Sequence, residues 1–204
     1  MNPRTIYRFL SWLLTGVLLL PLTASADPVK DLGQTVRAAT EEMLAVVCEK
    51  PTDDRPLAER AHAALQKYFD FAMMTRRAAG PGWRAYTPEQ QQRITTLLTE
   101  LVVRSYCSHF DPTIRSRASY ATPVELAKDR CELPTTIIYA SQNFAVTYRA
   151  EKIADSWHIY DVIVEGVSLV ANYRAQFNAL FQKGGAEAII RALEENLATP
   201  VPAK

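Results

Sequence analysis

The sequence predicts an α+β fold in which an antiparallel sheet of about four strands packs with a surrounding set of helices. Three observations support this. Residues 28–109 carry apolar residues at helical spacing, residues 124–164 contain strand-like runs separated by turn residues, and residues 168–197 return to helical spacing. The chain contains no internal repeat, and its 204 residues suit one domain with a sizeable core.

Residues 1–26 are predicted to be a cleaved signal peptide. Arg4 and Arg8 precede an apolar run of 14 residues, 9–22, and Ala24-Ser25-Ala26 supplies a small-residue cleavage site. The run is shorter than the roughly 20 residues of a membrane span, although an uncleaved N-terminal anchor is the alternative. No cysteine follows the cleavage site directly, so we do not expect a lipid-anchored lipoprotein. The mature chain, from residue 27, is expected to diffuse freely in an exported compartment.

The charge of the mature chain is close to zero. Removal of residues 1–26 takes away two basic and no acidic residues, so the formal net charge changes from +1 to −1. The chain also has no basic block. This gives no electrostatic footprint for nucleic acid and no polybasic patch for an anionic membrane, so neither is expected as a partner.

The cysteines and histidines predict no catalytic or metal site. Any one pair among Cys48, Cys107 and Cys131 is compatible with a disulfide in an oxidising compartment. Cys107, His109 and Asp111 lie close in sequence, but a helix end that runs into a loop explains them as well. We therefore expect no catalytic residue, no metal and no cofactor.

Four helices are expected before the sheet. Residues 28–49 carry one apolar stripe, a second helix begins near Pro56, and a short helical segment ends at the Gly80-Pro81-Gly82 break. Thr87 and Gln90 form a predicted capping box for a longer helix. Its unbroken apolar face is typical of an ordinary core, and consists of Ile94, Leu97, Leu98, Leu101, Val102 and Tyr106.

The strands are predicted at Val124–Ala127, 133–140, 144–150 and 157–164. The last strand is apolar on both faces, which indicates cover on both sides. Strict alternation places Trp157, Ile159 and Ile163 on one face and Tyr160, Val162 and Val164 on the other.

The chain after the last strand is predicted to be helical again. Glu165-Gly166 ends the strand, Ser168 is a candidate N-cap, and Gly184-Gly185 ends the helix that follows. A last helix is expected over 186–197. Residues 27–197 thus form one domain, and residues 198–204 are predicted to be a flexible tail.

Two segments resemble the MlaC family, the periplasmic phospholipid-binding component that is also described as a toluene-tolerance auxiliary protein. The first comprises Phe69-Asp70-Phe71 and GPGWRAYTPEQQQRITTLLTELVVRSY over residues 80–106. The second is WHIYDVIVEGVSLVANYRAQF over residues 157–177, followed by Gly184-Gly185. A hopanoid-associated branch shares the first motif, whereas the EGVSLVANYR stretch favours the lipid-transport branch.

The chain departs from the family pattern at several positions. Ile94 and Leu98 stand where the family favours Phe, and Ala79-Gly80 stands where it has Leu-Gly. Cys107 and Cys131 lie outside the pattern, and the stretch 111–143 matches it poorly.

The resemblance implies a soluble carrier without catalytic activity. Such proteins carry phospholipid between an outer-membrane lipoprotein–porin complex and an inner-membrane ABC transporter with an MCE-domain protein, and so maintain outer-membrane lipid asymmetry. The acyl tails lie in an apolar cavity between a curved sheet and helices. We expect this chain to be a monomer and to line the cavity with Leu97, Leu98, Leu101, Tyr106, Val146, Tyr148, Tyr160, Val162, Val164, Val167, Leu169 and Val170.

Simple energetics agree with a carrier. Burial of one CH₂ group contributes about 0.8 kcal/mol, so a chain of about 16 carbons needs roughly 12 kcal/mol of apolar shelter. Arg174 is a candidate for binding the head-group phosphate, and a surface ion pair is its ordinary alternative.

Two other functions remain open. Asp161 interrupts an apolar strand face and is the candidate base of a small-molecule enzyme, and the chain also fits a peptide-binding adaptor.

Overall fold

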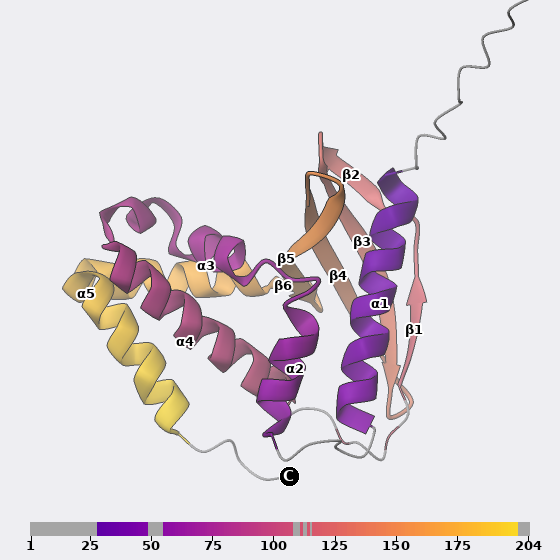
Figure 1. Ribbon diagram of the computed structural model, residues 1–204, viewed down its shortest axis with the longest axis horizontal. Helices are drawn as coiled ribbons and strands as arrows, with labels where there is room; N and C mark the ends of the chain where they lie inside the picture. Colours follow the sequence, from indigo (N-terminus) through magenta and orange to yellow (C-terminus); the bar gives the residue numbers. More distant parts are fainter. Residues whose placement is uncertain (1–27, 49–54, 108–110, 112–113, 115, 200–204) are drawn as a thin grey trace, which may run out of the picture.

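The computed structural model describes residues 28–48, 55–107, 111, 114 and 116–199 (Figure 1). The predicted signal peptide and residues 200–204 of the predicted tail lie outside the described residues. The helices are α1 Pro28–Cys48, α2 Leu57–Leu65, α3 Phe71–Ala79, the 3-10 helix η1 Gly80–Ala85, α4 Pro88–Cys107 and α5 Leu169–Ala198. The strands are β1 Arg117–Tyr120, β2 Val124–Ala127, β3 Arg130–Tyr139, β4 Gln142–Ile153, β5 Ser156–Val164 and β6 Val167–Ser168.

The strands form one curved, open antiparallel sheet in the order β1-β3-β4-β5-β6, and β2 pairs with the first residues of β3 (Figure 1). The α+β prediction is confirmed, but the sheet has six strands in the described residues instead of about four. The two additional strands, β1 and β6, contain four and two residues. Strand β6 is too short for alternation to indicate a strand, and β1, with the sequence RASY, contains no apolar run.

A β-bulge in β5 changes which side chains share a face. Arg149 of β4 pairs with Asp161, whereas the next residue, Ala150, pairs with Ile159, so the register shifts by one residue between them. Such an extra residue interrupts the alternation of a strand. Trp157, Ile159, Val162 and Val164 therefore pack together in one cluster, and the predicted division of β5 into two alternating faces is wrong.

Helix α1 covers the face of the sheet on which these β5 residues lie (Figure 1). We call the resulting group the sheet cluster. Leu32, Val36 and Ala39 of α1 have almost no exposed surface there. The buried residues of the sheet cluster are Leu32, Val36, Ala39, Cys131, Leu133, Val146, Ala150, Trp157, Ile159 and Val162.

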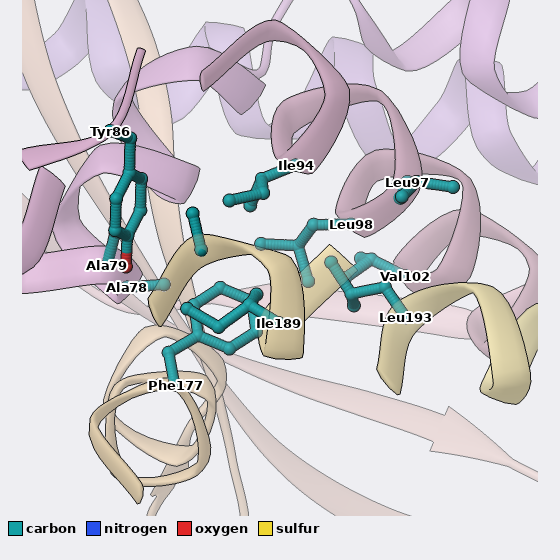
Figure 2. Packing of buried hydrophobic residues seen from close by; sticks show 11 residues of the cluster. Ala78, Ala79, Tyr86, Ile94, Leu97, Leu98, Val102, Phe177, Ile189 and Leu193 are labelled. Carbon is teal, nitrogen blue, oxygen red and sulfur yellow. The ribbon is translucent and has the colours of Figure 1, made fainter. Parts of the chain in front are cut away.

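Helices α4 and α5 form a second layer. Figure 2 shows Phe177, Ile189 and Leu193 of α5 directed toward Leu98 and Val102 of α4. We call this group, with Ala78, Ala79, Tyr86, Ile94, Leu97 and Ala186, the α4–α5 cluster. A smaller α2–α4 cluster contains Ala61, Phe71, Met74, Val103, Cys107 and Val170.

Local hydrogen bonds set the ends of these helices. The Thr87 N–H donates to Gln90 Oε1 at 3.0 Å and the Gln90 N–H donates to Thr87 Oγ1 at 3.2 Å, which confirms the capping box. Ser168 Oγ accepts from the Ala171 N–H at 3.0 Å, as expected of an N-cap. The break at Gly184-Gly185 is also confirmed, because both residues leave helical geometry and divide α5 into two arms.

None of the helices in the described part of the chain is both long and apolar enough to span a bilayer.

Candidate functional site

Partly exposed apolar side chains mark the boundary between the sheet and the helical layer. Tyr148 and Val164 pack at the edge of the sheet cluster, and Leu101 and Tyr106 pack at the edge of the α4–α5 cluster. Leu169 borders both the α4–α5 and the α2–α4 clusters. Each of these five side chains retains some accessible surface, so the boundary has apolar surface to offer a ligand.

Protein atoms surround the hydroxyl end of Tyr148 on β4. Burial raises its pKa to about 12, and a hydrogen bond with the Thr40 hydroxyl opposes this increase only in part. Its side chain is nevertheless only half-buried by accessible area. Tyr148 is therefore a partly accessible aromatic side chain on the apolar face of the sheet, and its hydroxyl lies among protein atoms.

Tyr106 connects this region to the helices. Burial raises its pKa, and the nearby Asp161 carboxylate raises that pKa further. Burial is also the main cause of the raised pKa values of Tyr148 and Tyr173, and the Tyr106 hydroxyl adds to both. Tyr106 of α4 is thus within electrostatic reach of a tyrosine on β4 and another on α5. All of these phenols are neutral at physiological pH.

The predicted lining residues fall into three groups. Leu97, Leu98, Val146, Val162 and Val170 are buried within the three clusters. The partly exposed members at the boundary are Leu101, Tyr106, Tyr148, Val164 and Leu169. Val167 and Tyr160 lie elsewhere.

Val167 and Tyr160 are held outside the boundary for different reasons. Val167 follows the β5–β6 turn and is 62% exposed. Tyr160 stands at the bulge, outside the sheet cluster, and the Arg77 guanidinium lies 4.0 Å from its ring centroid. Arg77 also forms an ion pair with Glu151, so a guanidinium group that is held in place covers the Tyr160 ring.

A recess also opens between α4 and the two arms of α5. Its volume is about 160 Å³, and it is bordered by Leu101, Ser105, Tyr173, Gln176, Phe177, Leu180, Ala192, Leu193 and Asn196. Pockets for drug-sized ligands occupy about 300–1,000 Å³. The recess is therefore too small for a two-tailed lipid.

Comparison with known families and structures identifies the group of proteins to which this arrangement belongs. The profile of the family described as MlaC protein matches residues 37–195. The chain belongs to the MlaC family. The chain is also similar to the phospholipid-binding protein from Ralstonia solanacearum, solved in complex with a phospholipid. The two are 26% identical, with a TM-score of 0.76 over 82% of this chain and 97% of that one. A comparison with curated proteins gave no match.

Asp161, the candidate catalytic base, serves a structural purpose in this MlaC-family fold. It is 3% exposed, and its carboxylate accepts hydrogen bonds from Ser168 Oγ at 2.7 Å and from the Val170 N–H at 3.0 Å. Arg149 Nη1 lies 3.8 Å away. The carboxylate thus binds the first turn of α5, where a negative charge is favourable. Both carboxylate oxygens accept hydrogen bonds, so Asp161 is held in place as a tether for α5.

Arg174, the candidate phosphate ligand, is also engaged. Its Nε and Nη2 groups donate to the Arg77 carbonyl oxygen at 2.9 and 2.5 Å. This carbonyl lies in the last turn of α3, where carbonyl oxygens lack an N–H donor from the helix itself. Arg174 therefore ties α5 to the end of α3.

Sequence reasoning missed several boundary residues. Phe144, Ile137 and Tyr120 border the sheet cluster, and Tyr173 borders the α4–α5 cluster. The sequence could have indicated Phe144 and Tyr173, since each belongs to a periodic apolar stripe. The sequence contained no such signal for Tyr120, because the other β1 residues, RAS, form no apolar stripe with it.

The thiols of Cys107 and Cys131 are both free and buried. Cys48 lies at the end of α1, and its side chain is outside the described part of the structure.

Proposed function

We propose that this chain is a periplasmic phospholipid carrier that shelters acyl tails at the boundary between the sheet and the helical layer. The observation that carries the proposal is the row of half-buried apolar side chains at this boundary, among them Tyr106 and Tyr148. The phospholipid bound by the similar Ralstonia protein supports the choice of ligand. The recess beside α5 is too small, so we assign the tails to the boundary, with Leu101, Val164 and Leu169 as further contacts.

We further propose that the carrier shuttles between an outer-membrane lipoprotein–porin complex and an inner-membrane MCE-domain ABC transporter, and so maintains outer-membrane asymmetry. A carrier needs apolar shelter of roughly 12 kcal/mol per tail of about 16 carbons, which polar contacts of about 1 kcal/mol each do not supply. It needs no acid–base chemistry. The engaged carboxylate of Asp161 agrees with this, and we propose that the chain acts as a monomer.

The test compares two single substitutions that add the same charge. Val164→Glu places a carboxylate at the boundary, where burial of an unpaired charge is costly. Val167→Glu, three residues away and 62% exposed, is the matched control. Leu98 is a poorer choice, because at 1% exposure a glutamate would unfold the α4–α5 cluster.

Each protein is purified from cells without detergent, and its bound lipids are extracted and quantified by mass spectrometry. We expect near-stoichiometric phospholipid in the wild type and in Val167→Glu, and at least ten-fold less in Val164→Glu at an unchanged circular dichroism spectrum. A wild-type protein that contains no phospholipid and takes none from vesicles would refute the proposal. Recovery of hopanoids instead would favour the hopanoid branch, and recovery of peptides would favour the adaptor.

Shuttling and oligomeric state need separate measurements. Phospholipid-loaded protein should lose its lipid when it is incubated with the reconstituted MCE-domain transporter but not with empty nanodiscs. Light scattering after size exclusion should give the mass of one chain. Retention of lipid in the presence of the transporter would contradict the shuttle while leaving lipid binding intact.

A further inference from the structure

The apolar face of the sheet contains one hydroxyl that satisfies no hydrogen bond. Thr135 of β3 is 5% exposed, and its Oγ1 has no partner among the described residues. A buried hydroxyl without a partner destabilises a protein, and valine would fill the same volume without this cost. The position of Thr135 therefore needs an explanation beyond packing.

Two tyrosines flank Thr135 on the same face of the sheet. Tyr120 of β1 is its direct partner in the β1–β3 register, and Val146 is its partner in the β3–β4 register. Tyr148, two residues after Val146, occupies the diagonal position, which long side chains span. Tyr120 and Tyr148 are both half-buried residues of the sheet cluster.

The surroundings fix both tyrosines. The guanidinium of Arg37 lies 4.5 Å from the ring centroid of Tyr120, which holds the ring against α1. The Thr40 hydroxyl donates to the Val36 carbonyl at 2.8 Å, and Thr40 also interacts with the Tyr148 hydroxyl and partly offsets the increase of its pKa. Tyr120 also contributes to the raised pKa of Tyr148, after burial, so the two hydroxyls lie within electrostatic reach of each other. Thr135, Tyr120 and Tyr148 therefore place three hydroxyl-bearing side chains at neighbouring positions on one face of the sheet.

We propose that Thr135, Tyr120 and Tyr148 bind the ester carbonyl oxygens of a diacyl phospholipid. An ester carbonyl is a hydrogen-bond acceptor without a proton of its own, and it matches a hydroxyl that lacks an acceptor. In a diacyl lipid it lies where the apolar tails begin, which suits hydroxyls set into an apolar face. The inference rests on the proposed function and deepens it, because it names the part of the lipid that this face recognises.

An ether lipid provides a direct test. A diester phosphatidylethanolamine and its diether analogue share chains and head group, but the diether has no carbonyl oxygen. Delipidated protein is incubated with vesicles that contain equal amounts of both, re-isolated, and analysed by mass spectrometry. One net hydrogen bond corresponds to a preference of about five-fold, so we expect the wild type to enrich the diester about five-fold or more.

Isosteric variants then assign the preference to this site. Thr135→Val and Tyr148→Phe should each reduce the diester preference toward one while both lipids still bind. Tyr86→Phe is the matched control, because the Tyr86 hydroxyl is also buried without a partner but lies in the α4–α5 cluster. It should keep the full preference. Thr135→Val should also raise the melting temperature of the lipid-free protein, since it removes an unsatisfied hydroxyl.

The outcomes separate this inference from the proposed function. Binding of both lipids without preference would overturn the inference and leave the carrier intact, whereas binding of neither would refute the carrier itself. A diester preference that persists in both Thr135→Val and Tyr148→Phe would place recognition elsewhere. A lower melting temperature for lipid-free Thr135→Val would mean that the hydroxyl is satisfied in the lipid-free fold, which also overturns the inference.

Discussion

Replacement of Asp161 by alanine should destabilise the protein strongly, because this carboxylate joins β5 to α5. The substitution removes hydrogen bonds to Ser168 Oγ at 2.7 Å and to the Val170 N–H at 3.0 Å, and leaves that buried N–H without a partner. A hydrogen bond to a charged group contributes about 1.5–3 kcal/mol, so the loss should total about 3 kcal/mol. For a domain of this size this lowers the melting temperature by about 6–12 °C.

Urea titration followed by circular dichroism measures this loss, with Ser168→Ala as the reference. That variant removes the N-cap and one of the two bonds to Asp161 and should cost about 1 kcal/mol. A catalytic base gives the opposite expectation, because removal of a functional carboxylate from a site often leaves stability unchanged or increased. A loss below about 1 kcal/mol in Asp161→Ala would refute the structural role that we assign to this residue.

Two further predictions concern a pair of glycines and a buried thiol. Gly33→Ala should stabilise the fold by about 1 kcal/mol, because Gly33 lies inside α1 and no atom lies near an added Cβ. Gly185→Ala should instead destabilise the fold by about 1–3 kcal/mol, because Gly185 has φ +64° and ψ −154°. Urea midpoints measure both, and an equal effect of the two substitutions would contradict the assigned backbone strain. Burial raises the pKa of the Cys107 thiol from 9.0 to about 11, so the folded protein holds this proton more tightly than the unfolded chain. The free energy of unfolding should therefore fall as the pH rises from about 9 to about 11, and less steeply in Cys107→Ala; parallel pH profiles would contradict this.

The helix ends could be predicted from the sequence because the interactions that form them are local. The Thr87–Gln90 capping box, the Ser168 cap and the Gly184-Gly185 break each depend on residues within a few positions of one another. Such local signals do not depend on the tertiary contacts of the helix. The start of α4 and the length of the first arm of α5 follow from them.

The composition of each strand face could not be predicted in the same way. Alternation counts residues along one strand, whereas a bulge is defined by the partner strand. Nothing in residues 157–164 indicates that Arg149 and Ala150 pair with Asp161 and Ile159 and leave Tyr160 as the extra residue. The candidate site was affected accordingly: Val162 and Val164 share a face with Ile159, and Tyr160 packs under Arg77 instead.

The boundary tyrosines show a second limit of sequence reasoning. Tyr106 and Tyr148 stand in stripes that an ordinary core would also have, and only their combination of enclosure and accessible surface distinguishes them. The exposure of each tyrosine depends on its neighbours in the folded chain, which no periodicity encodes. Thr135 was missed for a related reason, because an unsatisfied hydroxyl can be recognised only when its neighbours are known.

The bulge and the role of Asp161 have one structural consequence in common. The bulge allows β5 to place Ile159 and Val162 in the sheet cluster under α1 while Tyr160 contacts α3 through Arg77 and Asp161 binds the first turn of α5. Both layers are therefore attached to β5. Any separation of the layers that admits a lipid must leave this junction intact or break the hydrogen bonds of Asp161. Breaking the hydrogen bonds of Asp161 would cost about 3 kcal/mol, the value expected for Asp161→Ala. Separation of the layers at another part of the boundary, with these hydrogen bonds intact, costs less.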